Sequence, residues 1–135
     1  MFKRNFQIVL AVFVIALVTL ACEFSASTAK IDSVTLTADE NNVQATQVFS
    51  SSDVFYAVVV TKNAPDDTKV KAVWVAVQAE GVDPNYTIME KEMISDGNDT
   101  FTFSLSNDNL WPVGKYRVDI YLNDTLDQSV EFSVE

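Results

Sequence analysis

Apolar and polar residues alternate along much of the chain beyond residue 30, and this period of two restricts the possible folds more than any other feature of the sequence. The clearest example is residues 115–122, whose apolar members on one face are Tyr116, Val118, Ile120 and Leu122. The same alternation recurs in residues 101–105 and 129–135. Because successive side chains of a strand point to opposite faces, each segment is predicted to be a half-buried strand of an antiparallel sheet.

Other segments are predicted to be strands on weaker patterns. Residues 54–60 and 70–79 are apolar at almost every position, and residues 31–37 alternate only in part. Residues 86–94 fit a helical spacing as well as an extended one, and we assign them as a strand. About seven short strands without a clear helix predict an all-β fold, an antiparallel β-sandwich.

Turn-forming residues separate these segments. Residues 63–67 contain a proline, which cannot donate a hydrogen bond to a strand ladder. Asp96-Gly97 predicts a hairpin because glycine accepts a positive φ angle. Asn123-Asp124 predicts a last hairpin near the C-terminus.

The first 21 residues have the composition of an export signal. Lys3 and Arg4 make the start positive, and residues 8–21 are apolar or small apart from Thr19. As a helix these 14 residues would rise only about 21 Å, short of the ~30 Å hydrocarbon core of a bilayer. A permanent membrane span is the alternative, and the short length argues against it. Residues 1–21 are therefore predicted to be a cleaved signal peptide.

Removal of residues 1–21 leaves 114 residues, enough for one small domain with a buried core. They retain all 19 acidic residues and seven of the nine basic ones, which gives a net charge of −12. Such a balance excludes the basic surface that nucleic-acid binding requires. Nucleic acid is therefore not expected as a partner.

Catalytic side chains are scarce in the expected domain. The chain has no histidine, and its single cysteine is Cys22. The commonest general base and thiol nucleophile are therefore missing from residues 31–135. Paired carboxylates such as Glu90 and Glu92 could act in glycoside hydrolysis, but a solvated strand face explains them more simply. We predict no enzyme activity and no catalytic residue.

Acidic turns at residues 66–67 and 96–99 offer oxygen ligands of the kind that Ca²⁺ prefers. Neither turn has the ligand spacing of an EF-hand loop, and Asp and Asn also stabilise turns by themselves. The sequence therefore predicts no metal site and no cofactor.

The segment Val18-Thr19-Leu20-Ala21-Cys22 resembles the lipobox of bacterial lipoproteins. The resemblance implies cleavage between Ala21 and Cys22 and a lipid-modified Cys22 as the new N-terminus, although Thr19 stands where leucine is most frequent. It divides the chain into a lipoprotein signal peptide (1–21), a lipidated tether (22–30) and a domain (31–135). The expected location is the membrane, lipid-anchored and facing outside the cytoplasm, in the periplasm or at the cell surface.

Residues 110–118, together with the last strand through Phe132 and Val134, resemble the Ig-like (immunoglobulin-like) domain of small bacterial lipoproteins. The sequence Gly114-x-Tyr116-x-Val118 is similar to the tyrosine corner of such sandwiches. The resemblance implies that Val118 replaces the usual disulfide cysteine, with Val58 as its facing partner. Trp74 matches the core tryptophan of the third strand.

Two aromatic and aliphatic features have both a packing and a binding interpretation. Trp111 could be a platform for sugar rings, but its place before the corner turn favours packing at the end of the core. If Trp74 points inward, its alternating neighbours point outward and form an apolar ribbon, extended by Tyr121: Val73, Val75 and Val77. The ribbon is a candidate protein interface. The alternatives are that the adjacent strand or residues 86–94 cover it, or that a bulge changes the register.

The sequence thus predicts a lipid-anchored, non-catalytic Ig-like module that binds another protein of the bacterial envelope. The sheet expected to make this contact contains residues 70–79, 115–122 and 128–134. A ligand-binding domain for envelope glycan or Ca²⁺, using the acidic loops and Trp111, is the alternative. A hydrolase with carboxylate chemistry is the third hypothesis.

Overall fold

The computed structural model describes residues 29–41, 44–96 and 99–135. The regular elements of these residues are eight strands: β1 (Lys30–Thr37), β2 (Val48–Phe49), β3 (Phe55–Lys62), β4 (Lys69–Ala79), β5 (Tyr86–Ile94), β6 (Thr100–Leu105), β7 (Gly114–Leu122) and β8 (Thr125–Val134). No helix in the described ranges is long and apolar enough to cross a membrane.

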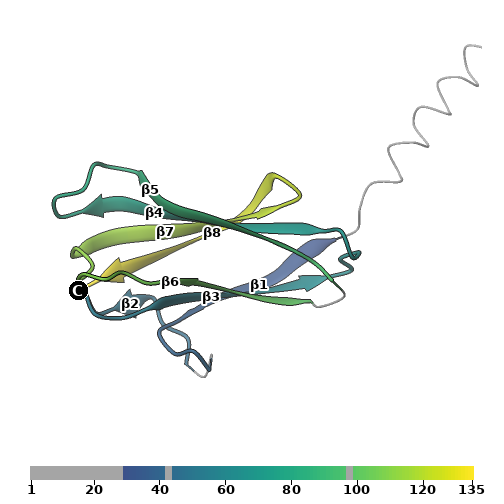
Figure 1. Ribbon diagram of the computed structural model, residues 1–135, viewed down its shortest axis with the longest axis horizontal. Helices are drawn as coiled ribbons and strands as arrows, with labels where there is room; N and C mark the ends of the chain where they lie inside the picture. The colour runs from purple at the N-terminus through teal and green to yellow at the C-terminus, as the bar shows by residue number, and fades with distance from the viewer. Residues whose placement is uncertain (1–28, 42–43, 97–98) are drawn as a thin grey trace, which may run out of the picture.

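The strands form two stacked sheets (Figure 1). One has three strands in the order β1-β3-β6, and the other has five in the order β2-β8-β7-β4-β5. Neighbours are antiparallel except β2 and β8, which pair in parallel over two residues. The predicted β-sandwich is confirmed, and the segment that fitted two spacings is strand β5. Strand β2 was not predicted, because two residues are too few to show an alternating pattern.

The predicted hairpin at Asp96-Gly97 is wrong. Strand β5 pairs with β4 in the five-stranded sheet, and the next strand, β6, pairs with β3 in the other sheet. The residues between them therefore connect two layers and do not join paired strands. Turn-forming residues serve both kinds of connection, so their presence alone does not identify a hairpin.

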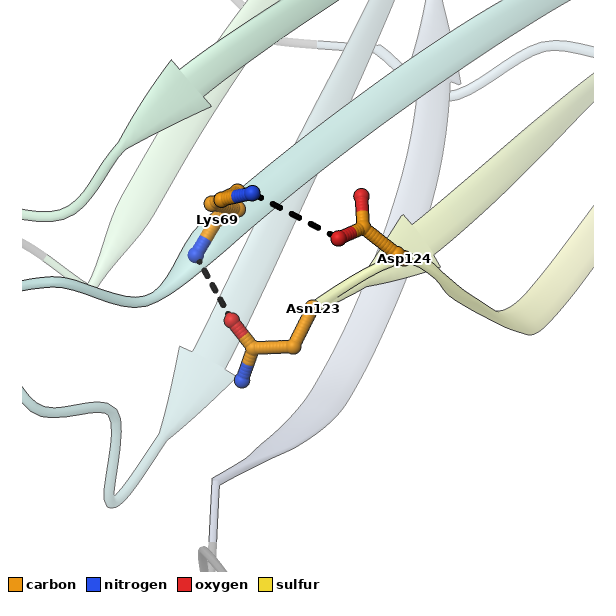
Figure 2. A network of polar contacts seen from close by, with 3 residues as sticks. All are labelled: Lys69, Asn123 and Asp124. Atoms are coloured by element: carbon orange, nitrogen blue, oxygen red, sulfur yellow. Dashed lines mark hydrogen bonds and ion pairs between the residues drawn. The ribbon is translucent and has the colours of Figure 1, made fainter.

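The hairpin predicted at Asn123-Asp124 is present between β7 and β8. Both residues have positive φ angles, 48° and 68°, as a two-residue type I′ turn requires. Figure 2 shows how this turn is attached to the start of β4. The backbone N–H of Lys69 donates to Asn123 Oδ1 at 3.0 Å, and Lys69 Nζ lies 3.4 Å from Asp124 Oδ2. The backbone N–H of Asn123 donates in return to the Lys69 carbonyl at 3.0 Å.

Aromatic side chains from both sheets fill the space between them. Phe55 on β3 lies at the centre, with ring centroids 4.7 Å from Trp111, 4.8 Å from Phe49 and 5.0 Å from Phe132. Trp74 on β4 is 1% exposed and lies 6.3 Å from Phe55. The expected inward position of Trp74 is therefore correct, and rings from four strands and one loop join the layers.

Val58 does not occupy the core position expected of it. The buried residues of β3 are Phe55, Ala57 and Val59, while Val58 is half-buried and paired with Thr35 and Thr102 on the opposite face. Val118 on β7 is fully buried, as the resemblance implied. The sequence misled at Val58 because this strand is apolar on both faces, so alternation alone does not show which face is inward.

Tyr116 forms the expected tyrosine corner. It is 1% exposed, and its hydroxyl donates a hydrogen bond to the backbone carbonyl of Pro112, four residues earlier. Burial raises the pKa of the Tyr116 hydroxyl above the ordinary value of tyrosine. The bond fixes the entry of the chain into β7.

Gly114, the first residue of β7, lies against the end of β4. It pairs with Ala79 and with Val134, and its φ angle is 156°. A Cβ atom at this position would lie 2.3 Å from the Gln78 carbonyl oxygen and 2.6 Å from the Ala79 Cα atom. Only glycine allows the two backbones to approach this closely.

We predict that Gly114→Ala lowers the free energy of unfolding by about 1–3 kcal/mol, since the added methyl group forces β4 and β7 apart. Urea unfolding of the full-length chain measures the loss. Gly81→Ala is the matched control, because Gly81 also has a positive φ, 72°, but no atom within 4 Å of the added Cβ. An equal loss in both variants would contradict the crowding at Gly114.

We predict that Tyr116→Phe lowers the free energy of unfolding by about 1 kcal/mol at neutral pH, because the bond to Pro112 is lost. Since the pKa of Tyr116 is raised in the folded state, unfolding releases its proton more readily, and stability falls as the pH rises above about 10. Tyr116→Phe should make this alkaline fall shallower. Urea unfolding at pH 7 to 11, with Tyr86→Phe at an exposed position as control, measures both effects.

Candidate functional site

The predicted interface valines lie on the outer face of the five-stranded sheet, the face turned away from β1, β3 and β6. Val73 pairs with Asp119 of β7 and Glu90 of β5, and Val75 pairs with Arg117. Val73 and Val75 are buried but are not members of the core cluster that contains Trp74. Their outward direction is therefore as expected from the alternation.

The expected exposed apolar ribbon is not present. Val73 is 7% exposed and Val75 is 4% exposed, and only Val77 is half-buried. Strand β4 lies between β7 and β5, whose longer side chains stand beside the valines on the same face. Strand β5, residues 86–94, thus covers them from the side and does not fold over them.

A bulge changes the register at Val77. The pairing of β4 with β7 shifts between Ala76 and Gln78, which leaves Val77 without a direct partner on β7. A bulge locally bends its strand and re-aims side chains. Val77 and Gln78 consequently both border the same surface groove.

A polar network joins β7 and β8 on the outer face. Asp119 Oδ1 accepts a hydrogen bond from Arg117 Nε at 2.8 Å and from Ser129 Oγ at 2.6 Å. Asp119 is only 7% exposed, although its place in the alternation predicted a wet position. The two donors compensate for the burial of its charge.

Tyr121, the fourth predicted interface residue, is half-buried beside Lys71. The two residues are register partners on β7 and β4, and Lys71 Nζ lies 4.6 Å from the centre of the tyrosine ring. This cation–π contact uses one face of the ring. One face of the Tyr121 ring is therefore occupied by a residue of the same sheet.

A shallow groove of about 1,040 Å³ runs along β8, from the outer face around to Val34 of β1 and Gln47. Its outer-face lining alternates charged, amide and hydroxyl side chains: Gln78, Lys115, Arg117, Ser129, Glu131 and Ser133. For the residues of β7 and β8 in this set, the alternation predicts only that they face solvent. The useful signal was their common face, since β7 and β8 are adjacent and the same parity of both strands points outward.

The charge of the outer face differs from that of the remaining domain. Among its register-paired residues, basic and acidic side chains balance, four against four: Lys69, Lys71, Lys115 and Arg117 against Glu90, Glu92, Asp119 and Glu131. Residues 29–135 as a whole carry seven basic and eighteen acidic residues, a net charge of −11. The outer face is therefore close to neutral, whereas the domain as a whole is strongly acidic.

Trp111 is part of the packing at the end of the sandwich. It is 7% exposed, its ring stacks on Phe55, and its Nε1–H donates to the Asp53 carbonyl at 3.0 Å. A cavity of about 450 Å³ lies next to it, lined by residues 51–54 and 107–111. The sugar-platform interpretation of Trp111 is therefore wrong, because the ring face is covered by another ring.

The acidic turns were the other part of the ligand-binding alternative. Within residues 29–41, 44–96 and 99–135, no three carboxylate, thiol or imidazole groups come together in a way that could hold a metal ion. Gly97 and Asn98 are outside these ranges. Ala21 and Cys22, the predicted cleavage and lipidation residues, also lie outside the described residues, so both remain predictions.

The two-sheet architecture is similar to that of a solved immunoglobulin-like protein from Pseudomonas aeruginosa. The TM-score is 0.55 at 15% sequence identity, and the match covers 82% of this chain and 99% of the other. The alkylpurine DNA glycosylase AlkC from Pseudomonas fluorescens, bound to DNA containing an abasic site analog, also matches, with a TM-score of 0.51 and 12% identity. That match covers 82% of this chain and 31% of the glycosylase chain.

At these identities the likeness shows the fold and nothing more. The chain forms an Ig-like β-sandwich, as the sequence predicted. No family model and no curated protein matches the sequence.

We predict that Val75→Lys lowers the free energy of unfolding by about 2 kcal/mol or more, because an ammonium group would enter a covered position without a carboxylate partner. Val77→Lys should cost less than about 1 kcal/mol, because Val77 borders the groove and the lysine head can reach water. Urea unfolding of the two variants compares the positions directly. Equal losses would mean that Val77 is as tightly covered as Val75.

Proposed function

We propose that this chain is a lipid-anchored, non-catalytic Ig-like module that is held outside the cytoplasm and docks its outer face on another protein of the bacterial envelope. The single observation that supports the docking surface is the groove of about 1,040 Å³ on a face that is nearly neutral, in a domain of net charge −11. At a nearly neutral face a partner meets little of the repulsion that the net charge of the domain would otherwise cause.

The character of the face favours a protein as the partner. Lys115, Arg117 and Glu131 border the groove with amides and hydroxyls. Val75 is a buried neighbour of Arg117 on the same face. Arg117 is already oriented by Asp119, so binding immobilises it at a smaller entropic cost. Docking of this kind is expected to be polar and salt-sensitive.

The lipobox-like segment ending at Cys22 supports the anchor. Two or three acyl chains at Cys22 would hold the domain stably, since each buried CH₂ contributes about 0.8 kcal/mol. The chain enters β1 at Lys30, which pairs with Lys62, so the first described strand begins at the end of the sandwich opposite the C-terminus (Figure 1). An anchor there would leave the groove, near the other end, facing away from the lipid surface.

The chemistry of the described residues supports a non-catalytic role. The chain has no histidine, and Tyr116, whose pKa is raised by burial, donates its hydroxyl to a backbone carbonyl inside the corner. Such a hydroxyl positions the chain and is not available as an acid or base.

We predict that the full-length chain carries a diacylglycerol group on Cys22 when it is produced in a bacterium, and that outer-face positions cross-link to one envelope protein. Intact mass spectrometry of the membrane fraction tests the modification, with Cys22→Ala as the unmodified control. A photoreactive amino acid at Ser133, in the groove, tests the contact, and the same group at Ser104 on the exposed side of β6 is its control.

The proposal requires a discrete adduct at Ser133 that is absent at Ser104 and weakened by Arg117→Glu. An unmodified Cys22 thiol would contradict the anchor. Equal labelling at both positions would contradict the docking face. The two measurements are independent, so one part of the proposal can fail while the other stands.

A further inference from the structure

Strand β5 is the outermost strand of the five-stranded sheet, and its far edge has no neighbouring strand among the described residues. It is nine residues long, Tyr86–Ile94, and contains neither glycine nor proline. Seven of its residues are exposed, and only Ile88 and Met93 are half-buried. A long unpaired edge offers a row of free backbone donors and acceptors to another strand.

The exposure of β5 follows from the unequal sizes of the two sheets. Five strands face only three, and on the last strand of the larger sheet only Ile88 and Met93 pack against the core. Figure 1 shows β5 at the margin of its sheet, beside β4. Three of the seven large apolar side chains exposed in the described residues are on this strand: Tyr86, Met89 and Ile94. Exposed apolar groups beside a free edge favour the addition of a strand.

The charges of β5 indicate which strand would fit. Glu90 and Glu92 lie on the outer face, opposite Val73 and Lys71 of β4, and Lys91 lies on the inner side, opposite Ala72. An added strand places its own side chains directly beside these, because cross-strand partners share a face. The residues of the added strand that lie opposite Glu90, Lys91 and Glu92 must therefore be basic, acidic and basic, in that order.

A second copy of β5 fits this pattern poorly. The two-fold antiparallel register that pairs all nine residues sets Glu90 against Glu90. A shift of the symmetry centre to Lys91 sets Lys91 against Lys91 and Glu90 against Glu92. Like charges directly opposite each other destabilise strand pairing. The self-pairing register that uses the whole of β5 is thus disfavoured, whereas a complementary segment can pair along the full strand.

We propose that the free edge of β5 binds an extended segment of a partner protein by strand addition, and that the segment carries basic residues at two alternate positions with an acidic residue between them. Apolar residues flank this triplet in the segment, beside Met89 and Met93 on the inner side and Ile94 on the outer side. The main chain supplies affinity, and the charge triplet supplies register. This inference does not rest on the outer-face groove.

A synthetic peptide tests the proposal with the full-length protein in zwitterionic detergent micelles. The probe is the fluorescently labelled octapeptide Thr-Val-Val-Lys-Glu-Lys-Val-Thr, which matches Glu92, Lys91 and Glu90 in an antiparallel arrangement. The charge-reversed peptide Thr-Val-Val-Glu-Lys-Glu-Val-Thr should bind at least about tenfold more weakly by fluorescence anisotropy. In this peptide three pairs of opposite charges become three pairs of like charges. Equal binding of both peptides would overturn the proposal.

Main-chain pairing is tested separately with two N-methylated forms of the probe, one methylated at the odd and one at the even positions. Both keep the charge, but only one set of N–H groups faces β5 in an added strand. One form should lose binding and the other should keep it. If both forms bind as well as the unmethylated probe, the contact is purely electrostatic and strand addition is refuted.

Matched variants locate the contact on the protein. Glu90→Gln with Glu92→Gln should weaken probe binding roughly three- to tenfold. Asp108→Asn with Glu135→Gln removes the same charge at exposed positions outside β5 and should leave binding unchanged. Equal weakening by both pairs would place the interaction in the overall negative field and not at the edge. A dimer found by analytical ultracentrifugation and strengthened by Glu90→Gln, as expected of β5 paired with itself, would also overturn the choice of a heterologous partner.

Discussion

The contact between the two sheets depends on aromatic rings that meet at Phe55. Its ring lies within 5.0 Å of Phe49, Trp111 and Phe132, and Tyr116 stacks on Phe132 at 5.5 Å. Each aromatic pair contributes about 0.5–1.5 kcal/mol beyond the area that it buries. Sandwiches of this type often use a disulfide between the layers. Here residues 29–135 contain no cysteine, so side-chain packing, with the rings at its centre, must hold the sheets together.

The unequal sheets then determine what kinds of surface the domain presents. The three-stranded sheet covers the aromatic centre, and the five-stranded sheet extends beyond it. Strand β4 lies between two neighbouring strands, β7 and β5. Side chains of these neighbours bury Val73 and Val75, although both valines point away from the core. At the margin, β5 is exposed on both faces and along one edge. One sheet thus offers a rigid, charge-balanced face and a free edge with its own charge pattern.

The sequence allowed prediction of the strands and of the inward set Tyr116, Val118 and Ile120, because these alternate cleanly with polar neighbours. It failed where a strand is apolar on both faces. At Val58 the alternation does not show whether the side chain points into or out of the core. At Val75 it correctly predicts an outward side chain, but it does not predict that this side chain is buried. Exposure depends on side chains of neighbouring strands, which are distant in the chain. The pairing of Arg117, Asp119 and Ser129 likewise depends on the register of β7 against β8, which no local pattern specifies.

A sandwich held together by rings and not by sulfur is indifferent to the redox state of its surroundings. The same packing can form in a reducing or an oxidising compartment, so folding of this domain requires no thiol oxidase or disulfide isomerase. Cys22 is the single cysteine of the sequence, so the chain has no second cysteine with which it could form an intramolecular disulfide. Chemistry at that sulfur atom can then proceed without a competing intramolecular bridge to any partner cysteine.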